Sequence, residues 1–378
     1  MRIAVLFTCF NRIEKTIGCI ESVERAAYLA GAEIEWFVTD GGSSDGTAEM
    51  LHFLAGHENV YDAIKSEVLR DKGFKDSPVV VNANIDSKMH ARVEKGAYYS
   101  QGMKACMQML DDVCTKAVGT VGYDSEEGAR FSESAEIFGN SEPDECFRML
   151  KTAAGTGSRF DYVMLVNDDV EFFEDFLVKM LKYSENAGEN TTIVGAACAE
   201  VGDKSFDANG DESKRKNRVQ TYGGIRYNAR PKEYNTGFLN LIKSLLPVSV
   251  KYKMVTIGEN DLRCDTFNAN CVLIPWEAYE ASEKMDKHFV HGLGDFDYGL
   301  CLKGEKLSTD FYVGVCANNE KSGTWMDTEL VKYERVRRLN GVKGAPTKQW
   351  FYYLNKHFGF MSAVVYSISP YVRILLGK

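Results

Sequence analysis

The sequence predicts an α/β fold in which a mostly parallel sheet is flanked by helices. Two apolar runs of the strand type, 2–8 and 34–39, each precede a segment with helical spacing of apolar residues. A third apolar run, 162–167, ends in Asp168 and Asp169 and also precedes a helical pattern. Because strands that alternate with helices pair in parallel through right-handed crossovers, the three runs predict one sheet.

The remaining elements follow from apolar spacing along the chain. Apolar residues recur at helical spacing from 13 to 23, and Asn11 is placed to cap this helix. The strand at 34–39 runs into a polar loop at 40–47 and then into a second helix. Further strands are expected at 78–81, 192–198 and 267–275, and further helices at 98–110 and 173–181.

Two polar stretches with weak periodicity interrupt this pattern, near 118–159 and 202–218, and we interpret them as insertions. From residue 350 onward the chain is aromatic and apolar with scattered basic residues. We therefore expect a main domain at 1–320 and a helical C-terminal extension at 321–378.

Composition excludes several classes of protein. The chain has 378 residues, 44% of them apolar, which is enough to bury a core. Its 54 acidic and 45 basic residues give a net charge of −9, which argues against a general nucleic-acid binder. Ten cysteines without a CxxC pair predict reduced, core-filling thiols of a cytoplasmic protein. The first residues are expected to form a strand of the mature fold, and no apolar run is long enough to cross a membrane.

Three pairs of carboxylates stand at expected strand ends or in Gly-flanked turns. These are Asp40 with Asp45, Asp168 with Asp169, and Asp295 with Asp297. The first two pairs follow strands of one parallel sheet, so they are expected at the same edge, where open α/β folds bind ligands. Adjacent carboxylates repel unless a cation lies between them. Mg²⁺ or Mn²⁺, held by carboxylates and a diphosphate, would meet this requirement.

The loop at 40–47 is rich in Asp, Gly and Ser. Its glycines would let the backbone approach a ligand closely, and its carboxylates could accept hydrogen bonds from ribose hydroxyls or base N–H groups. An ordinary turn before a helix explains the same residues, so both interpretations stay open. The sequence has neither a GxGxxG nor a GxxxxGK[ST] motif, and thus supports neither a Rossmann dinucleotide site nor a P-loop.

Four motifs in order resemble the family 2 glycosyltransferases of the GT-A fold, over a span from Arg2 to about Leu307. Residues 8–12 (TCFNR) look like the opening segment of that family, and residues 40–47 look like its nucleotide loop. Residues 167–169 (NDD) stand where the family has its DxD-type motif. Residues 294–297 (GDFD) stand where it has E-D-x-D, with Gly294 in place of the usual Glu.

The resemblance implies an inverting transfer of a sugar from a nucleotide-diphosphate sugar to a glycan or lipid-linked acceptor, in bacterial surface polysaccharide or glycoconjugate synthesis. Asp169 would bind Mg²⁺ or Mn²⁺, and Asp295 would be the catalytic base. The nucleotide would be bound by Thr8, Asn11, Arg12, Asp40, Asp45 and Asp168. The donor and acceptor pocket would include Asn268, Asn270, Asp297 and His291.

The C-terminal extension allows two interpretations. A basic segment at 335–338 is followed by aromatic residues at 350–353 and an apolar stretch at 358–376, which suits an amphipathic segment at a membrane surface. Pro370 and Arg373 argue against a membrane-spanning helix. Packing of the extension on the main domain explains the same pattern, so peripheral membrane contact and packing both stay open.

Two other functions remain open. A sugar nucleotidyltransferase also uses a nucleotide-binding α/β sheet, but it is expected to have a Gly-rich loop with Arg and Lys after the first strand. Residues 8–12 lack such a loop. A non-catalytic module that binds a nucleotide or a carbohydrate is the second alternative, because fold does not determine function.

Overall fold

The computed structural model describes most of the chain. The described residues are 1–64, 87–121, 160–188, 190–200, 218–228, 247–316, 325–342 and 344–378. The strand expected at 78–81 lies outside them. The two expected insertions also lie outside them, except at 118–121, where a helix continues, and at 218, where a strand begins.

The N-terminal part alternates strands and helices as expected. Its elements are β1 (Arg2–Cys9), α1 (Ile13–Ala30), β2 (Glu33–Asp40), α2 (Thr47–Ala55), α3 (Val60–Ile64), β3 (Ser87–Val93), α5 (Tyr99–Val121) and β4 (Tyr162–Asn167). Strands β3, β2, β1 and β4 pair in parallel in this order. The helix expected at 98–110 continues to Val121, because residues 111–121 contain neither Pro nor a closing signal before Gly119.

The second part completes the sheet and adds a smaller one. Its elements are β5 (Val170–Phe172), α8 (Phe176–Ala187), β6 (Thr192–Glu200), β7 (Arg218–Tyr222), β8 (Gly224–Tyr227), β9 (Tyr252–Met254), β10 (Thr266–Phe267), β11 (Cys271–Pro275), α10 (Trp276–Glu280), α11 (Leu293–Cys301) and β12 (Lys306–Cys316). Strands β10, β8 and β9 form a separate antiparallel sheet.

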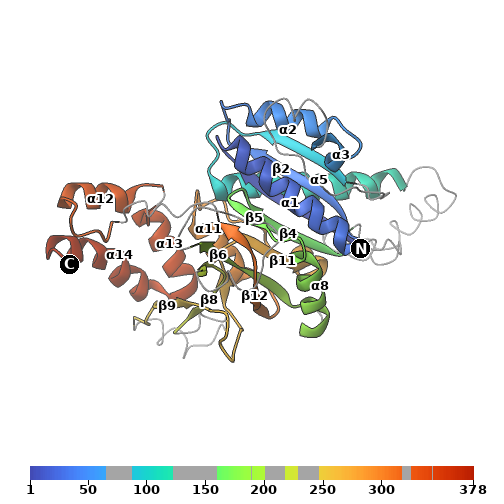
Figure 1. Ribbon diagram of the computed structural model, residues 1–378. Helices are drawn as coiled ribbons and strands as arrows, with labels where there is room; N and C mark the ends of the chain where they lie inside the picture. The colour runs from blue at the N-terminus through green and yellow to red at the C-terminus, as the bar shows by residue number, and fades with distance from the viewer. Residues whose placement is uncertain are drawn as a thin grey trace, which may run out of the picture.

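The large sheet has the order β3-β2-β1-β4-β11-β6-β12-β5, with β7 paired to β6. It confirms the α/β fold, with helices on both faces (Figure 1). Beyond β4 the pairing is mixed. Strand β11 runs antiparallel to β4 and β6, whereas β12 runs parallel to β6. An apolar run in the sequence carries no direction, which is why the antiparallel strands were not expected.

The sheet is buried on both faces, which explains the continuous apolar runs. In β1, Ile3, Val5 and Phe7 pack with α1 and α8, whereas Ala4 and Leu6 pack with α5 on the other side. Figure 1 shows α1 and α8 on the same side of the sheet. The loops at the ends of the strands therefore extend from a sheet that is packed on both sides.

Two expected features of the C-terminal half differ from the structure. The strand expected at 267–275 is divided into β10 and β11 by residues 268–270. Asp295 and Asp297, expected in a turn, lie in the first turns of helix α11. Glycines 292 and 294 suggested a turn, but Gly292 instead precedes the helix, and Gly294 lies where α11 packs closely on Ser100.

Three helices form the C-terminal region, namely α12 (Lys332–Asn340), α13 (Thr347–Phe358) and α14 (Phe360–Leu375). They lie together at one end of the molecule (Figure 1). A third apolar cluster joins Tyr353 and Phe358 of α13 to Tyr227 of β8 and Phe289 before α11. Packing of the extension on the rest of the chain, one of the two interpretations left open by the sequence, is therefore present, and it is made mainly by α13.

Candidate functional site

The candidate site lies at one edge of the large sheet. In the register of the parallel strands, Cys9 of β1 is beside Asp40 of β2, and Thr8 is beside Asn167 of β4. The antiparallel strand β11 begins at this edge, where the backbone N–H of Asn167 donates to the carbonyl of Asn270 at 3.3 Å. The sequence-based expectation that the segments after β2 and β4 meet at one edge is therefore confirmed.

Asp40 is fully buried and organises its own loop. One carboxylate oxygen accepts hydrogen bonds from the backbone N–H groups of Gly42 at 2.9 Å and Ser43 at 2.8 Å. The other accepts from the Ser43 hydroxyl at 2.5 Å. Both oxygens are thus engaged within the loop. Gly41 must lack a side chain, because a Cβ there would lie 2.9 Å from the carbonyl of Ala97.

Asn11 and Asp45 connect the two loops that follow β1 and β2. The backbone N–H of Asn11 donates to Ser43 Oγ at 2.7 Å, and Asn11 Oδ1 accepts from the backbone of Ser44 at 2.7 Å. Asp45 accepts from the backbone N–H of Ile13 at 3.0 Å, at the start of α1. The expectation that Asn11 caps α1 is therefore wrong. Asn11 has a left-handed backbone with φ of 50°, which turns its side chain toward the neighbouring loop.

Asp168 and Asp169 are buried beside Arg12, which precedes α1, and Lys15 of α1. Arg12 Nη1 donates to Asp168 Oδ1 at 2.9 Å. Burial raises the pKa of Asp168 to about 6, although Arg12 opposes the shift, and Asp169 adds to it. Burial also raises the pKa of Asp169 against the charges of Arg12 and Lys15. Asn270 donates to Asp169 at 3.4 Å.

Asp295 lies in the first turn of α11 and is buried. It accepts hydrogen bonds from the backbone N–H groups of Ala269 at 3.3 Å and Phe296 at 2.9 Å. Burial raises the pKa of Asp295 to about 7, and these two N–H groups limit the shift. A carboxyl with this pKa can hold or release a proton near neutral pH, as a general base requires.

The Gly that replaces Glu before Asp295 has a packing role. A Cβ at Gly294 would lie 2.7 Å from Ser100 Cβ and 2.2 Å from Ser100 Oγ, closer than atoms of two side chains can approach. Ser100, at the start of α5, donates to the carbonyl of His291 at 2.9 Å. The contact between α5 and α11 therefore excludes any side chain at position 294.

The adjacent residues Ala269 and Asn270 connect Asp295 and Asp169, because the Ala269 backbone N–H donates to Asp295 at 3.3 Å and the Asn270 side chain donates to Asp169 at 3.4 Å. The charges of both carboxylates also act on two tyrosines. Burial raises the pKa of Tyr222 to about 12, with further contributions from the charges of Asp169 and Asp295. Burial also raises the pKa of Tyr99, and the same two carboxylates contribute. Tyr222 ends β7 and Tyr99 begins α5. Neither tyrosine was expected from the sequence, because neither belongs to a recognisable motif.

Thr8, expected to bind the nucleotide, and Asn268 and His291, expected in the donor and acceptor pocket, have mainly structural contacts. Thr8 is buried and packs near Gly102 of α5. Asn268 is half-buried, and its backbone N–H donates to the carbonyl of Gly223 at 3.3 Å. The half-buried His291 ring lies edge-on to Tyr98 and Tyr99, with centroids 6.5 and 6.4 Å away.

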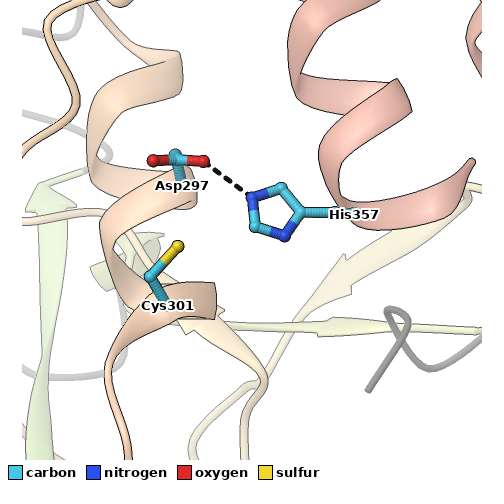
Figure 2. A group of neighbouring side chains, drawn as sticks. All are labelled: Asp297, Cys301 and His357. Atoms are coloured by element: carbon cyan, nitrogen blue, oxygen red, sulfur yellow. Dashed lines mark hydrogen bonds and ion pairs between the residues drawn. The ribbon is translucent and has the colours of Figure 1, made fainter. Parts of the chain in front are cut away.

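Asp297 faces away from Asp295, toward α13. Lys356 Nζ lies 2.8 Å and 2.9 Å from the two Asp297 oxygens, and His357 Nε2 lies 2.7 Å from Oδ1. Figure 2 shows Asp297 and His357 facing each other across the two helices, with Cys301 one turn farther along α11. Two residues apart on a helix, Asp295 and Asp297 point to different sides.

Asp297, Cys301 and His357 have the composition of a metal site, and within the described ranges they form the one such group of three. Their chemistry does not favour a metal. Burial, together with Asp297, raises the pKa of the Cys301 thiol to about 11, so the sulfur is protonated at neutral pH. Lys356 already supplies the positive charge that Asp297 needs. We interpret the group as an interhelical ion pair.

Asp168 and Asp169 fit a divalent cation better. Both are buried carboxyls with raised pKa values, and a cation bound between them would favour the ionised form of both. Mg²⁺ and Mn²⁺ commonly bind one or two protein carboxylates and complete their coordination with phosphate oxygens and water. Arg12 and Lys15 add positive charge beside the same place, which suits an anionic ligand.

A groove of about 390 Å³ adjoins the site. Ser100, which packs on Gly294, is part of its wall, and so are Lys95, Lys104 and Lys287. Two acids also line the groove, but both have partners, since Glu94 pairs with Arg92, and Asp286 pairs with Lys356 and His288. The lining of the groove thus carries three lysines and two acids that already have cationic partners.

Comparison with known proteins finds similar solved structures only, since no protein-family model and no curated protein matches the sequence. A mannosyltransferase, PcManGT from Pyrobaculum calidifontis in complex with GDP-Man and Mn²⁺, matches 99% of this chain and 73% of its own, at 10% identity and a TM-score of 0.42. Residues 1–349 of TarS from S. aureus match 99% of this chain and 81% of their own, at 9% identity and a TM-score of 0.40. The same TarS fragment in complex with UDP matches 94% of this chain and 70% of its own, at 8% identity and a TM-score of 0.39. At this degree of similarity, function has to be argued from the residues of the site.

Proposed function

We propose that this protein transfers a sugar from a nucleotide-diphosphate sugar to an acceptor hydroxyl, with inversion at the anomeric carbon. The observation that carries the proposal is the convergence of three buried carboxyls, Asp168, Asp169 and Asp295, with Arg12 at one sheet edge. Arg12 precedes α1, Asp168 and Asp169 follow β4, and Asp295 lies in α11, so three distant segments of the chain contribute. Together they provide a base and a place for an anionic leaving group, as a single displacement requires.

Asp295 is the proposed catalytic base. Its pKa of about 7 places the carboxyl near the operating pH, where proton transfer from an acceptor hydroxyl is most effective. The two backbone N–H groups that bind Asp295 hold its orientation without neutralising it. General-base help of this kind contributes roughly 10²–10⁴-fold to the rate.

Arg12 and Lys15 are proposed to bind the diphosphate, and Asp169, supported by Asp168, to bind Mg²⁺ or Mn²⁺. A divalent cation bound here would neutralise charge on the departing nucleoside diphosphate. The Arg12 side chain is only about one third exposed, and its ion pair with Asp168 already orients it. Binding of a phosphate would therefore cost little conformational entropy of this side chain. Asn11, Asp40 and Asp45 would act by holding the loops 8–12 and 40–47 in the shape that receives the nucleotide.

The direct test is turnover by the purified protein. With Mn²⁺ and a panel of UDP-, GDP- and dTDP-sugars, we expect one donor class to release nucleoside diphosphate, and the release to increase when an acceptor is added. Release of pyrophosphate from a nucleoside triphosphate and a sugar phosphate would instead establish a nucleotidyltransferase. Saturable binding without turnover of any donor would establish the non-catalytic module.

The groove beside Ser100 is the proposed path of the acceptor, and its three lysines favour an acceptor that carries phosphate or carboxylate groups. Lys104→Glu should raise the acceptor KM severalfold and leave the donor KM unchanged. Lys303→Glu, at an exposed lysine outside the groove, is the matched control. An equal rise of both KM values, or no change, would contradict the assignment.

We also propose that residues 1–320 form the catalytic unit and 321–378 an extension of it. The apolar cluster shared by α13, β8 and the segment before α11 supports a close association of the two parts. The ion pair between Asp297 and Lys356 adds a polar contact to it.

A further inference from the structure

Helix α14 exposes an apolar face to solvent. Its packed side consists of small or apolar residues, Ser362, Ala363, Ser367, Pro370 and Ile374. Its exposed side is also apolar and comprises Val365, Ile368 and Val372, continuing into Leu375 and Leu376, and Phe360 is exposed at the start of the helix. Leu375 is 69% exposed, although it is a large aliphatic residue.

The two apolar faces lie opposite each other. At 100° per residue, the packed residues 363, 367, 370 and 374 occupy one sector of the helix, and 365, 368, 372 and 375 occupy the opposite one. A helix on the surface of a water-soluble domain normally has polar residues on its outer face. Between Phe360 and Val372, α14 has no charged residue. Packing among the described residues therefore does not account for the outer face.

The apolar surface continues onto the start of α12. Lys332 Nζ donates to the carbonyl of Leu375 at 2.8 Å, which places the first turn of α12 beside the end of α14. Val331 and Tyr333, on either side of Lys332, are exposed, Tyr333 to 78%. We call these exposed residues of α12 and α14 the outer apolar face. Exposed apolar residues of two neighbouring segments thus gather at the end of α14, and exposed apolar groups of this kind mark interaction sites.

Charge distinguishes this part of the chain from the rest. Residues 325–378 contain nine Lys and Arg against three Asp and Glu, a formal charge of +6. The preceding residues contain 36 basic and 51 acidic side chains, a formal charge of −15. Exposed Arg373 and Lys378 and the Lys332 side chain lie next to the outer apolar face. An apolar surface bordered by cations is complementary to an anionic lipid surface.

We propose that the outer apolar face binds the surface of a bilayer that contains anionic lipids, with α14 lying in the plane of the interface. Within the described ranges, no helix has the length and apolar character needed to cross a bilayer, so contact at the surface is the mode that fits. The proposal is independent of the sugar transfer proposed above, because none of its residues belongs to the carboxylate site.

The buried side chain of Arg335 holds α12 and the end of the chain together beside this face. Arg335 is buried at the base of α12 and donates to the carbonyl of Trp325 at 2.8 Å and to that of Lys378 at 2.6 Å. It therefore fixes the C-terminal end of the chain to α12. The sequence-based interpretation of 335–338 as a basic surface segment does not apply to Arg335, because that side chain is used internally. Arg337 and Arg338 pair with Glu334 and remain at the surface.

Vesicle flotation of the full chain tests the proposal. Vesicles of phosphatidylcholine with about one third phosphatidylglycerol should carry the protein to the top of the gradient, whereas vesicles of phosphatidylcholine alone should carry roughly tenfold less. Added salt should weaken binding to the anionic vesicles, because it screens the attraction between the basic residues and the lipid charges. The variant with both Ile368→Asp and Val372→Asp should lose at least tenfold in binding to the anionic vesicles.

The matched control is the variant with Leu29→Asp and Val178→Asp. These two residues lie on helices α1 and α8 and are 50% and 42% exposed, close to 55% and 45% for Ile368 and Val372. The control should float like the unmodified protein. Equal flotation of the control and the Ile368/Val372 variant would overturn the proposal. A second outcome would also overturn it. In that outcome the unmodified protein does not bind vesicles but forms a stable dimer in sedimentation, and the Ile368/Val372 variant is a monomer. A second copy of the chain would then cover the face.

Discussion

Asp295→Asn should reduce sugar transfer by roughly 10²–10⁴-fold and at the same time make the protein more stable at alkaline pH. The rate falls because the amide cannot accept the proton of the acceptor hydroxyl. The amide oxygen can still accept the hydrogen bonds of Ala269 and Phe296, so the local fold is retained. Donor binding should change little, which distinguishes loss of the base from loss of the site.

The stability effect follows from the raised pKa of Asp295, about 7 in the folded protein. In the unfolded chain this carboxyl titrates near 4, so between about pH 4 and 7 the folded state binds a proton that the unfolded state lacks. Stability therefore decreases as the pH rises through this window, by on the order of 2–4 kcal/mol for this one group. Replacing the carboxyl with an amide should abolish this decrease in stability.

Thermal or urea unfolding at pH 5 and pH 8 measures the effect. Asp295→Asn should narrow the gap in unfolding free energy between the two pH values. Asp310→Asn, at an exposed carboxyl of β12, is the control and should leave both the gap and the turnover unchanged. Turnover of Asp295→Asn within a fewfold of the unmodified protein would rule out Asp295 as the base.

Asp169→Asn should abolish stabilisation by metal and nucleotide together. If Mn²⁺ and a nucleoside diphosphate bind the native protein at about a hundredfold excess over Kd, they stabilise it by about 2.7 kcal/mol. The amide is a much weaker ligand for a hard cation, so this gain should disappear and transfer should fall at least ~10²-fold. Asp310→Asn again serves as the control.

The metal titration also separates the two candidate cation sites. Cys301→Ala changes the group of Asp297, Cys301 and His357 and should leave the Mn²⁺ response intact, because Lys356 occupies that place. A loss of the response in Cys301→Ala with a normal response in Asp169→Asn would transfer the metal role to the interhelical group.

The sheet and the edge that carries the site could be predicted from sequence, because strands buried on both faces leave continuous apolar runs. The segments 2–8, 34–39 and 162–167 all had this form, and all are parallel neighbours in the structure. Strand direction beyond β4 could not be predicted, since pairing there depends on contacts between distant segments. A sequence motif identified Asp295 as a candidate site residue. The helix that contains Asp295 was not predicted, because Gly292 and Gly294 suggested a turn.

Side-chain partners were the least predictable part of the site. Asp297 pairs with residues about sixty positions away, and no local pattern indicates that contact. Asp40 was expected to be open to a ligand, but three donors from its own loop surround its carboxylate. Tyr222 follows a segment with no clear pattern, so its place beside Asp169 and Asp295 emerged only from the three-dimensional arrangement.

Helix α11 has two carboxylates with different attachments. Asp295 is held by the backbone of Ala269, between β10 and β11, whereas Asp297 is held by Lys356 and His357 of α13. A displacement of α13 would therefore be transmitted along a single helical turn to the proposed base. Since α13 continues directly into α14, the surface that we assign to a bilayer and the carboxyl that we assign to proton transfer are mechanically connected.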